Sequence, residues 1–566
     1  MSFAQRNYAI RKRAWPSIVQ VIFSRFYNQI LAGLPQPANR IDVICDRVIA
    51  GTLVLYAVFA PHSIALTEGS ALVGAVAWAV QLARTRGFDR LRTPADIALF
   101  GFFACCVVSS LFSFVPATSI NGLRSQAFFL AFYFVSGKVA SVRHARWLII
   151  AIVVSCLINV AWSAGQLIKG RGVRIDAISA GSPFAESDLI PGDVIIEADG
   201  QKVNSKEDIS RIVDSNRGRL TLEFQRKESL GETSLSRRDI KSSDGSGTDR
   251  LGLVTSPGRN FRITGLYSHY ETYAEVLQLI AALAAGLIVA YPMRRSPAFF
   301  LLIAAAGLIV CALVLTSTRA PIAGLAAAVV VMSLAISRRR ITAATVLFLL
   351  ILVPAAVVAV QRSRGVSFID PQEGSTAYRL EVWKEAINLV RGNPVIGIGR
   401  GTEGDERFKE EYKLFGDGKL PVGHFHSTPV QVAAWWGLAA LGFYSCFMTI
   451  FIREMWRLSK SEHANRDWSF RAVSLGALGA IVAFNVSSLV HFNFGDGEVA
   501  MMLWLISGIG FAVRRIARQA VDGTESAYKQ SAAGQDSSNR NQLQQPAGAV
   551  APAAQAVAAP RDQPRR

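Results

Sequence analysis

Long apolar segments recur along almost the whole chain, and they restrict the possible folds more than any other feature of the sequence. A segment of about 20 predominantly apolar residues is long enough to cross a bilayer as an α-helix, and roughly twelve segments meet that criterion. They cover residues 42–61, 64–83, 95–115, 120–137, 146–168, 272–292, 297–315, 320–336, 341–360, 429–452, 470–489 and 499–513. We therefore predict an all-α polytopic membrane protein, with one small α+β domain inserted between the helices.

The composition supports this class. Hydrophobic residues make up 51% of the 566 residues, which is too apolar for several soluble domains. The net charge of +19 would suit a nucleic-acid partner, but the basic residues form short clusters between apolar segments, as in cytoplasmic loops. We expect contacts with membrane lipids and no nucleic acid. The cysteines lie in or beside apolar segments without metal-ligand or thiol-exchange spacing, so we predict no metal site, no disulfide and no cofactor.

The distribution of Lys and Arg predicts the orientation of the helices. Alternate connections are basic, whereas the intervening short turns 61–63, 116–119 and 491–498 carry no Lys or Arg. Basic loops stay in the cytoplasm, so this alternation predicts an even number of spans with both termini inside. Two long inserts then fall on the outer face, which in a bacterium is the periplasm.

The resulting organisation has five parts. A basic cytoplasmic segment without signal-peptide features (1–40) precedes a first bundle of five helices (41–168), a soluble insert (172–257) and a region of seven helices (265–518) that contains a large periplasmic loop (361–428). The tail (519–566) is rich in Ala, Gln, Pro, Ser and Gly, and we predict that it is disordered and cytoplasmic.

The soluble insert has short alternating strands separated by turn signals. Its order of elements resembles a PDZ domain of the type found in bacterial periplasmic and site-2 proteases. The resemblance rests on Gly181-Ser182-Pro183, Pro191-Gly192-Asp193-Val194-Ile195, Asp199-Gly200, a capped amphipathic helix over 205–213 and a strand over 220–224. The hydrophilic stretch 228–249 is expected to be a flexible loop.

PDZ domains bind an extended peptide as an added strand, with a backbone nest for its terminal carboxylate. The segment Arg250-Leu251-Gly252-Leu253 fits the family's carboxylate loop, at the C-terminal end expected of a circularly permuted bacterial domain. The resemblance therefore implies a protein C-terminus as partner. A structural spacer without a ligand is the alternative.

Three ionisable residues lie near the outer ends of predicted spans, where charges are costly to desolvate and are candidates for function. Arg319 follows a short Thr/Ser turn, Arg379 opens an amphipathic helix, and His426 precedes the tenth span. The two arginines also have an ordinary interpretation, because Arg319 could reach lipid headgroups and Arg379 could be a solvated helix charge.

Together these residues resemble the superfamily of O-antigen ligases and polymerases, which are membrane glycosyltransferases. The matching features are Arg319 after the turn 316–318, the Arg-x-x-x-Trp pair of Arg379 and Trp383, the Pro-x-x-Gly-x-Gly turn at 394–399, and His426-Ser427 separated from Gly437 by nine residues. The ligase pattern has Gly, Thr or Tyr three residues after that glycine. Ala440 occupies this position and departs from the pattern, so ligase and polymerase both remain open.

The resemblance implies an inverting, metal-independent transfer of a glycan from undecaprenyl diphosphate to a lipid A core or another glycan, at the periplasmic face of the bacterial inner membrane. Arg319 and Arg379 would bind the donor diphosphate, since guanidinium groups stabilise phosphate oxygens well. His426 would act as general base. His424 is expected to point elsewhere, and His269 and His491 are expected to be structural.

Two other classes remain. An O-antigen or exopolysaccharide polymerase would use the same residues on a different acceptor. A transporter would also have about twelve spans, but the sequence has neither paired charges in mid-span nor repeated halves. A scaffold or sensor that carries a PDZ domain is the third possibility.

Overall fold

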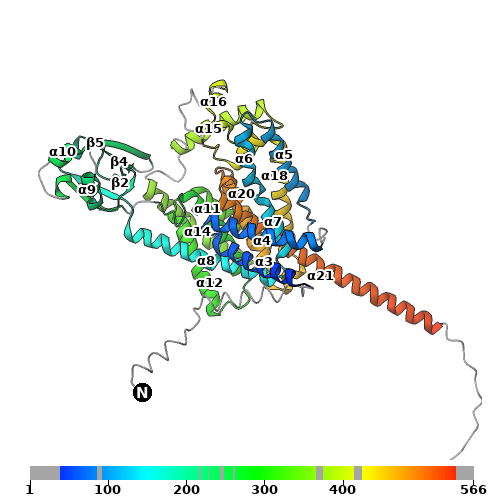
Figure 1. Cartoon of the computed structure of the whole chain (residues 1–566). Helices are drawn as coiled ribbons and strands as arrows, with labels where there is room; N and C mark the ends of the chain where they lie inside the picture. The colour runs from blue at the N-terminus through cyan, green and yellow to red at the C-terminus, as the bar shows by residue number, and fades with distance from the viewer. Residues whose placement is uncertain are drawn as a thin grey trace, which may run out of the picture. The chain divides into compact units, whose positions relative to one another are not determined.

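The computed structural model describes residues 39–85, 92–215, 218–226, 229–242, 248–258, 262–364, 374–412 and 423–543. The basic segment predicted for 1–40 lies almost entirely outside the described residues. The chain divides into two units, residues 1–515 and 516–566. The fold class is confirmed: the chain is an all-α polytopic membrane protein with an inserted PDZ-like domain (Figure 1).

The helices before the insert are α3 (Arg40–Phe59), α4 (Ile64–Thr85), α5 (Asp96–Leu111), α6 (Pro116–Gln126), α7 (Leu130–Lys138) and α8 (Val142–Lys169). After the insert come α11 (Tyr270–Ala290), α12 (Pro297–Leu315), α13 (Arg319–Ile336), α14 (Arg339–Arg364), α15 (Gly374–Gly392), α16 (Glu406–Tyr412), α18 (Thr428–Ser459), α19 (Glu462–Arg466), α20 (Trp468–Ser488) and α21 (Gly497–Leu543).

Among the described residues, nine helices are long and apolar enough to cross a membrane: α4, α8, α11, α12, α13, α14, α18, α20 and α21. The other three predicted spans correspond to α3, which carries four charged residues near its start, to the shorter α5, and to 120–137. That last segment is divided into α6, a 3-10 turn at Ala127–Phe129 and α7. Whether these three cross the bilayer remains a prediction.

The tail differs from its predicted disorder, because α21 continues to Leu543. Residues 519–543 contain several Ala and Gln, which are good helix formers, and adding residues to an existing helix avoids the cost of nucleation. The remaining residues, 544–566, lie outside the described part of the chain.

Helices α11, α20 and the apolar part of α21 are the most buried in the second helical region. Small residues allow α11 and α20 to approach each other closely. A Cβ built on Gly286 would lie 2.4 Å from the backbone nitrogen of Gly476. A Cβ on Gly324 of α13 would likewise lie 2.6 Å from the carbonyl oxygen of Ala483. Such contacts are typical of helix packing in membranes, where close van der Waals contact drives association.

The insert forms one antiparallel sheet in the order β5-β4-β2-β1-β6, with β3 paired to β2. Its strands are β1 (Val173–Ile178), β2 (Val194–Ala198), β3 (Gln201–Lys202), β4 (Arg219–Arg226), β5 (Ser229–Ser236) and β6 (Leu253–Pro257), and its helices are α9 (Lys206–Ser215) and α10 (Arg237–Ser242). Its buried apolar cluster draws only on residues between Val173 and Leu253. The domain therefore has a hydrophobic core of its own.

The expectation of a flexible loop at 228–249 is wrong for residues 229–242, which form β5 and α10. β5 pairs with β4 along its whole length, from Arg226 opposite Ser229 to Arg219 opposite Ser236. Its polar sequence lacks the alternation that marks a half-buried strand, so only pairing with β4 defines it. Residues 243–247 lie outside the described residues.

Candidate active site

His426 lies in a segment before α18 that we call the histidine loop, residues 423–428. Its backbone has a left-handed φ of 48°, which is uncommon for a residue with a side chain. The backbone N–H of His426 donates to Nδ1 of His424 at 3.1 Å, and the two ring centroids are 4.1 Å apart. The expectation that His424 points elsewhere is wrong, because the bent backbone places both rings together.

Hydrogen bonds from neighbouring helices hold this loop. The indole Nε1–H of Trp383 on α15 donates to the carbonyl oxygen of Phe425 at 2.8 Å. The backbone N–H of the fully buried Phe425 donates to Oε1 of Gln431 at 2.7 Å. Both backbone groups of one buried residue are thus engaged, so the loop's conformation is strongly determined.

Arg379 lies on α15 close to His426. The ring of its neighbour Tyr378 packs edge-on against the His426 ring, with the centroids 5.7 Å apart. Burial lowers the pKa of His426, and the positive charges of His424 and Arg379 lower it further, to about 4, while Glu271 opposes them. The structure thus brings two of the three predicted residues, Arg379 and His426, into electrostatic contact.

Arg319 is the first residue of α13, directly after the buried turn 316–318. Arg262, which sequence reasoning missed, holds that turn: its Nε donates to the carbonyl oxygen of Thr316 at 2.8 Å, and a terminal nitrogen donates to Oγ1 of Thr318 at 3.0 Å. Its guanidinium also lies over the ring of Tyr270, 3.4 Å from the centroid. Arg319 is therefore linked to the start of α11 through Arg262.

A buried histidine and carboxylate lie beside the histidine loop. Nδ1 of His491 is 2.7 Å from Oε1 of Glu275 on α11. The carbonyl oxygen of His491 accepts hydrogen bonds from both the backbone N–H and the hydroxyl of Thr428, at 3.0 and 3.1 Å. Sequence reasoning missed this pair. A carboxylate inside an apolar helix, as Glu275 is, was a signal in itself, but nothing in the sequence connects it to His491, in a short turn far along the chain.

The turn at 394–399 explains the glycine of the histidine motif. Gly437 has a φ of 83° inside α18 and kinks that helix. The kink frees carbonyl oxygens of α18, and those of Ala434 and Trp435 accept hydrogen bonds from Ile398 and Gly399 at 2.9 and 2.8 Å. A Cβ on Gly437 would lie 2.0 Å from the carbonyl oxygen of Val395, so only glycine fits there.

A second buried carboxylate follows this turn. Glu403 is 2% exposed and accepts the indole N–H of Trp435 at 2.8 Å. Burial raises its pKa to about 7, although the Trp435 hydrogen bond and the charge of Arg400 act in the opposite direction. The ring of Trp435 contacts that of Phe492, which in turn contacts His424, with centroids 5.1 and 5.7 Å apart. Glu403 therefore belongs to the layer behind the histidine loop.

In the predicted carboxylate loop of the insert, the side chain of Arg250 is bonded to residues of α9. A terminal nitrogen of Arg250 donates to Oδ2 of Asp214 at 2.7 Å and to Oγ of Ser210 at 2.8 Å. The hydrogen bond to Asp214 and the charge of Arg250 lower the pKa of Asp214. The N–H groups of Leu251 and Gly252 donate to the carbonyl oxygens of Thr248 and Asp249. Leu253 begins β6, which ends the sheet.

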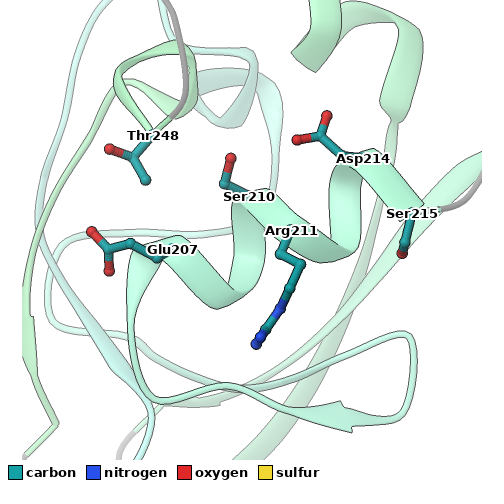
Figure 2. A pocket seen from close by; sticks show the side chains of 6 residues that line it. All are labelled: Glu207, Ser210, Arg211, Asp214, Ser215 and Thr248. Carbon is teal, nitrogen blue, oxygen red and sulfur yellow. The ribbon is translucent and has the colours of Figure 1, made fainter.

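A shallow surface depression of about 540 Å³, lined by polar residues, lies against α9 next to this loop. Five of its six lining residues belong to α9, and Figure 2 shows Thr248 across from Ser210. The lining residues are Glu207, Ser210, Arg211, Asp214, Ser215 and Thr248. Charges of both signs therefore flank the position where a PDZ ligand would lie.

Within the described residues, no group of three or more His, Cys, Asp or Glu side chains could hold a metal ion. The carboxylates and imidazoles near His426 are instead engaged with one another or with protein donors, as the Glu275–His491 pair and the Glu403–Trp435 bond illustrate.

Residues 304–445 match the O-antigen ligase family. This segment contains Arg319, Arg379 and His426, but neither Arg262 nor the Glu275–His491 pair. Residues 174–226 match the PDZ domain family, so the insert carries a protein-interaction domain. No curated protein matches the chain. The O-antigen ligase match supports a glycosyltransferase-like function in polysaccharide assembly, with glycan and lipid substrates.

Proposed function

We propose that this protein is an inverting, metal-independent glycosyltransferase of the O-antigen ligase type. It moves a glycan from an undecaprenyl diphosphate carrier to an acceptor at the periplasmic face of the bacterial inner membrane. The observation that carries the proposal is the packing of α15, which bears Arg379, against the histidine loop, where the ring of Tyr378 contacts that of His426 and Trp383 donates to Phe425. Both elements lie within the segment that matches the ligase family. A cation for the leaving group and an imidazole for the acceptor are the two groups this reaction needs.

The leaving group requires positive charge, because departure of a lipid diphosphate places negative charge on phosphate oxygens. Arg379 is half-buried, and Arg319 opens α13 beside a buried turn. In a partly dry site, guanidinium groups can stabilise phosphate oxygens through paired hydrogen bonds without a metal ion. We assign both arginines to the donor diphosphate.

The lipid chain of the donor requires an apolar surface next to these charges. An apolar cavity of about 260 Å³ lies between α15, which carries Arg379, and α18, which follows the histidine loop. Its lining residues are Ala386, Ile387, Val390, Arg391, Pro429, Val430, Ala433 and Leu441. This cavity supports a donor whose hydrocarbon chain lies along α15 while its diphosphate contacts Arg379.

The acceptor hydroxyl must lose its proton as it attacks the anomeric carbon. His426 is neutral at physiological pH, because its lowered pKa of about 4 keeps the imidazole unprotonated. A neutral imidazole can accept a hydrogen bond from that hydroxyl. Attack from the side opposite the diphosphate inverts the anomeric centre.

A polymerase of the same superfamily is the second candidate. The residue that favours it is Ala440, which is fully buried and replaces the residue types expected there in a ligase. The diphosphate and proton-transfer groups would be the same, and only the acceptor would differ.

The PDZ-like domain extends the proposal to a partner. We assign it a protein C-terminus that would add to the free edge of β6, with Arg250 meeting the terminal carboxylate in place of Asp214. Because both inserts are assigned to the outer face, that partner would lie on the same side of the membrane as the transfer reaction.

The test uses the full-length protein in detergent with an undecaprenyl diphosphate oligosaccharide and two acceptors, a lipid A core and a second lipid-linked glycan. The His426→Ala variant should transfer about 10²- to 10⁴-fold more slowly. The control variant His463→Ala alters a histidine of α19 and should retain activity. EDTA should have no effect. Full transfer by His426→Ala, or strict dependence on a divalent ion, would contradict the mechanism.

A further inference from the structure

The buried Glu275–His491 pair has the arrangement of an oriented base. Glu275 is 2% and His491 6% exposed, and Nδ1 of His491 is 2.7 Å from the carboxylate. A carboxylate on one ring nitrogen fixes the imidazole's tautomer and orientation. Since Nδ1 then carries the proton, Nε2 is the accepting nitrogen, and within the described residues it has no hydrogen-bond partner.

The pair lies beside the histidine loop. The two hydrogen bonds from Thr428 to the carbonyl oxygen of His491 attach it to the loop's last residue, two positions after His426. Besides Glu275, charged or titratable groups of three elements interact electrostatically with His491: Glu271 of α11, Arg379 of α15, and His424 and His426 of the loop. His491 thus shares the surroundings of the proposed catalytic groups.

We propose that His491, oriented by Glu275, takes the proton of the acceptor hydroxyl, a step that sequence reasoning assigned to His426 alone. This inference rests on the proposed function. The acceptor O–H bond breaks, and its electron pair forms the new bond to the anomeric carbon. The bond from that carbon to the diphosphate breaks, with its electrons leaving on the phosphate oxygen. The proton moves to Nε2 of His491, and the Glu275 carboxylate stabilises the imidazolium.

The electrostatics of the two histidines favour this division. Burial lowers the pKa of His491, but the hydrogen bond to Glu275 and the charge of Glu271 outweigh it, so the pKa is raised above 6.5. His426, with a pKa of about 4, is the weaker base. A base is most effective when its pKa lies near the working pH, and a carboxylate partner favours the protonated state formed in the reaction. His426 then contacts the acceptor and excludes water.

The pH dependence of kcat/KM separates these roles, because the base must be unprotonated. With His491 as the base, the rate of the wild-type protein should fall on the acid side of a midpoint at or above pH 6.5. With His426 as the base, that midpoint should lie near pH 4. Glu275→Gln removes the carboxylate's charge but preserves the shape of the side chain. It should lower kcat/KM at pH 7 by about 10²- to 10⁴-fold and move the midpoint to lower pH.

The matched control is Glu454→Gln, which alters a half-buried carboxylate that pairs with Arg514 on α21. It should leave the pH profile unchanged. A Glu275→Gln variant that is slower with an unchanged midpoint would show a merely structural role and overturn the inference. Because Glu275→Gln could also affect folding, its melting temperature and elution volume are measured beside those of Glu454→Gln.

A second measurement does not depend on transfer. Nitrogen NMR spectra of histidine-labelled protein should show His491 titrating at higher pH than His426, and Glu275→Gln should lower the His491 midpoint. The opposite order would overturn the inference even in an inactive preparation. If the wild-type protein transfers no glycan to either acceptor, the proposed function fails, and this titration still decides whether the pair is an oriented base.

Discussion

Trp383 donates its indole N–H to the backbone carbonyl oxygen of Phe425 across 2.8 Å, and this bond joins α15 to the histidine loop. Four residues before Trp383, on the same side of the helix, Arg379 lies close to His426. The Arg-x-x-x-Trp motif thus has a mechanical explanation. The Trp383 hydrogen bond attaches α15 to the histidine loop. Arg379, on the same helix, then interacts electrostatically with His426.

Replacing Trp383 by Phe should therefore lower kcat/KM, because the Phe425 carbonyl loses its donor and the loop loses its attachment to α15. A buried carbonyl without a partner costs about 1–3 kcal/mol, which corresponds to a roughly 5- to 150-fold change in an equilibrium or rate. Transfer assays in detergent measure this loss. Trp162→Phe, at a side chain 55% exposed on α8, is the control and should be neutral. Equal activities of the two variants would show that the bond does not position the site.

The exchange Arg379→Lys should lower transfer by about 10²- to 10³-fold, the usual cost of losing one preorganised donor to a developing negative charge. Lysine keeps the charge but lacks the planar fork that binds two phosphate oxygens. The control is Arg407→Lys on α16, where the side chain is exposed. Measuring KM and kcat for the lipid-linked donor separates weakened binding from slower chemistry. A Lys variant as active as the wild type would remove Arg379 from the diphosphate site.

Glu403 predicts a pH dependence of stability. Its ordinary pKa is 4.5 and its folded pKa is about 7, so between these values the folded protein holds a proton that the unfolded chain has lost. This contribution to stability is complete below pH 4.5 and is lost as the pH rises through 7. Glu403→Gln cannot ionise, and its amide oxygen can still accept the Trp435 N–H. Between pH 5 and pH 8 its melting temperature should therefore fall less than that of the wild type, whereas the exposed Glu406→Gln should behave like the wild type.

Sequence patterns predicted the membrane class, the insert and the neighbourhood of Arg379 and His426, because these depend on local features. Apolar segment length, turn signals and motif spacing are all visible along a single stretch of chain. The kink at Gly437 shows the limit of such patterns. The motif spacing identified this glycine, but only its contact with the carbonyl oxygen of Val395 explains why a glycine is required there.

The remaining features depend on long-range contacts that a single sequence does not display. Glu275 and His491 are more than two hundred positions apart, and neither lies in a recognisable motif. The polar strand β5 has no alternating pattern and exists through its pairing with β4. Arg262 lacks a motif as well, yet it holds the turn before Arg319. In each case a contact with a residue far away in the sequence defines the feature, and no local pattern predicts it.

The proposed topology predicts that both large inserts lie outside the cytoplasm. A reporter that works only in the periplasm should give signal when fused after Ser215, on the helix α9 of the insert. Fusion after Ser459, at the end of α18 beside a basic connection, provides the control and should give signal only from a cytoplasmic reporter. Cytoplasmic signal at Ser215 would contradict both the orientation and the proposed periplasmic site.

Deleting the PDZ-like domain tests whether it serves a partner or acts as a spacer. The backbone N–H of Arg171 donates to the carbonyl oxygen of Gly258 at 2.8 Å, so the two ends of the insert are adjacent. Because the core draws only on residues between Val173 and Leu253, a short Gly/Ser linker in place of 172–256 removes a self-contained unit. We expect transfer in detergent to persist while polysaccharide output in cells falls. Arg250→Ala in the intact chain should reproduce the cellular loss if the domain acts through its carboxylate loop. Unchanged output from the deletion would support the spacer interpretation instead.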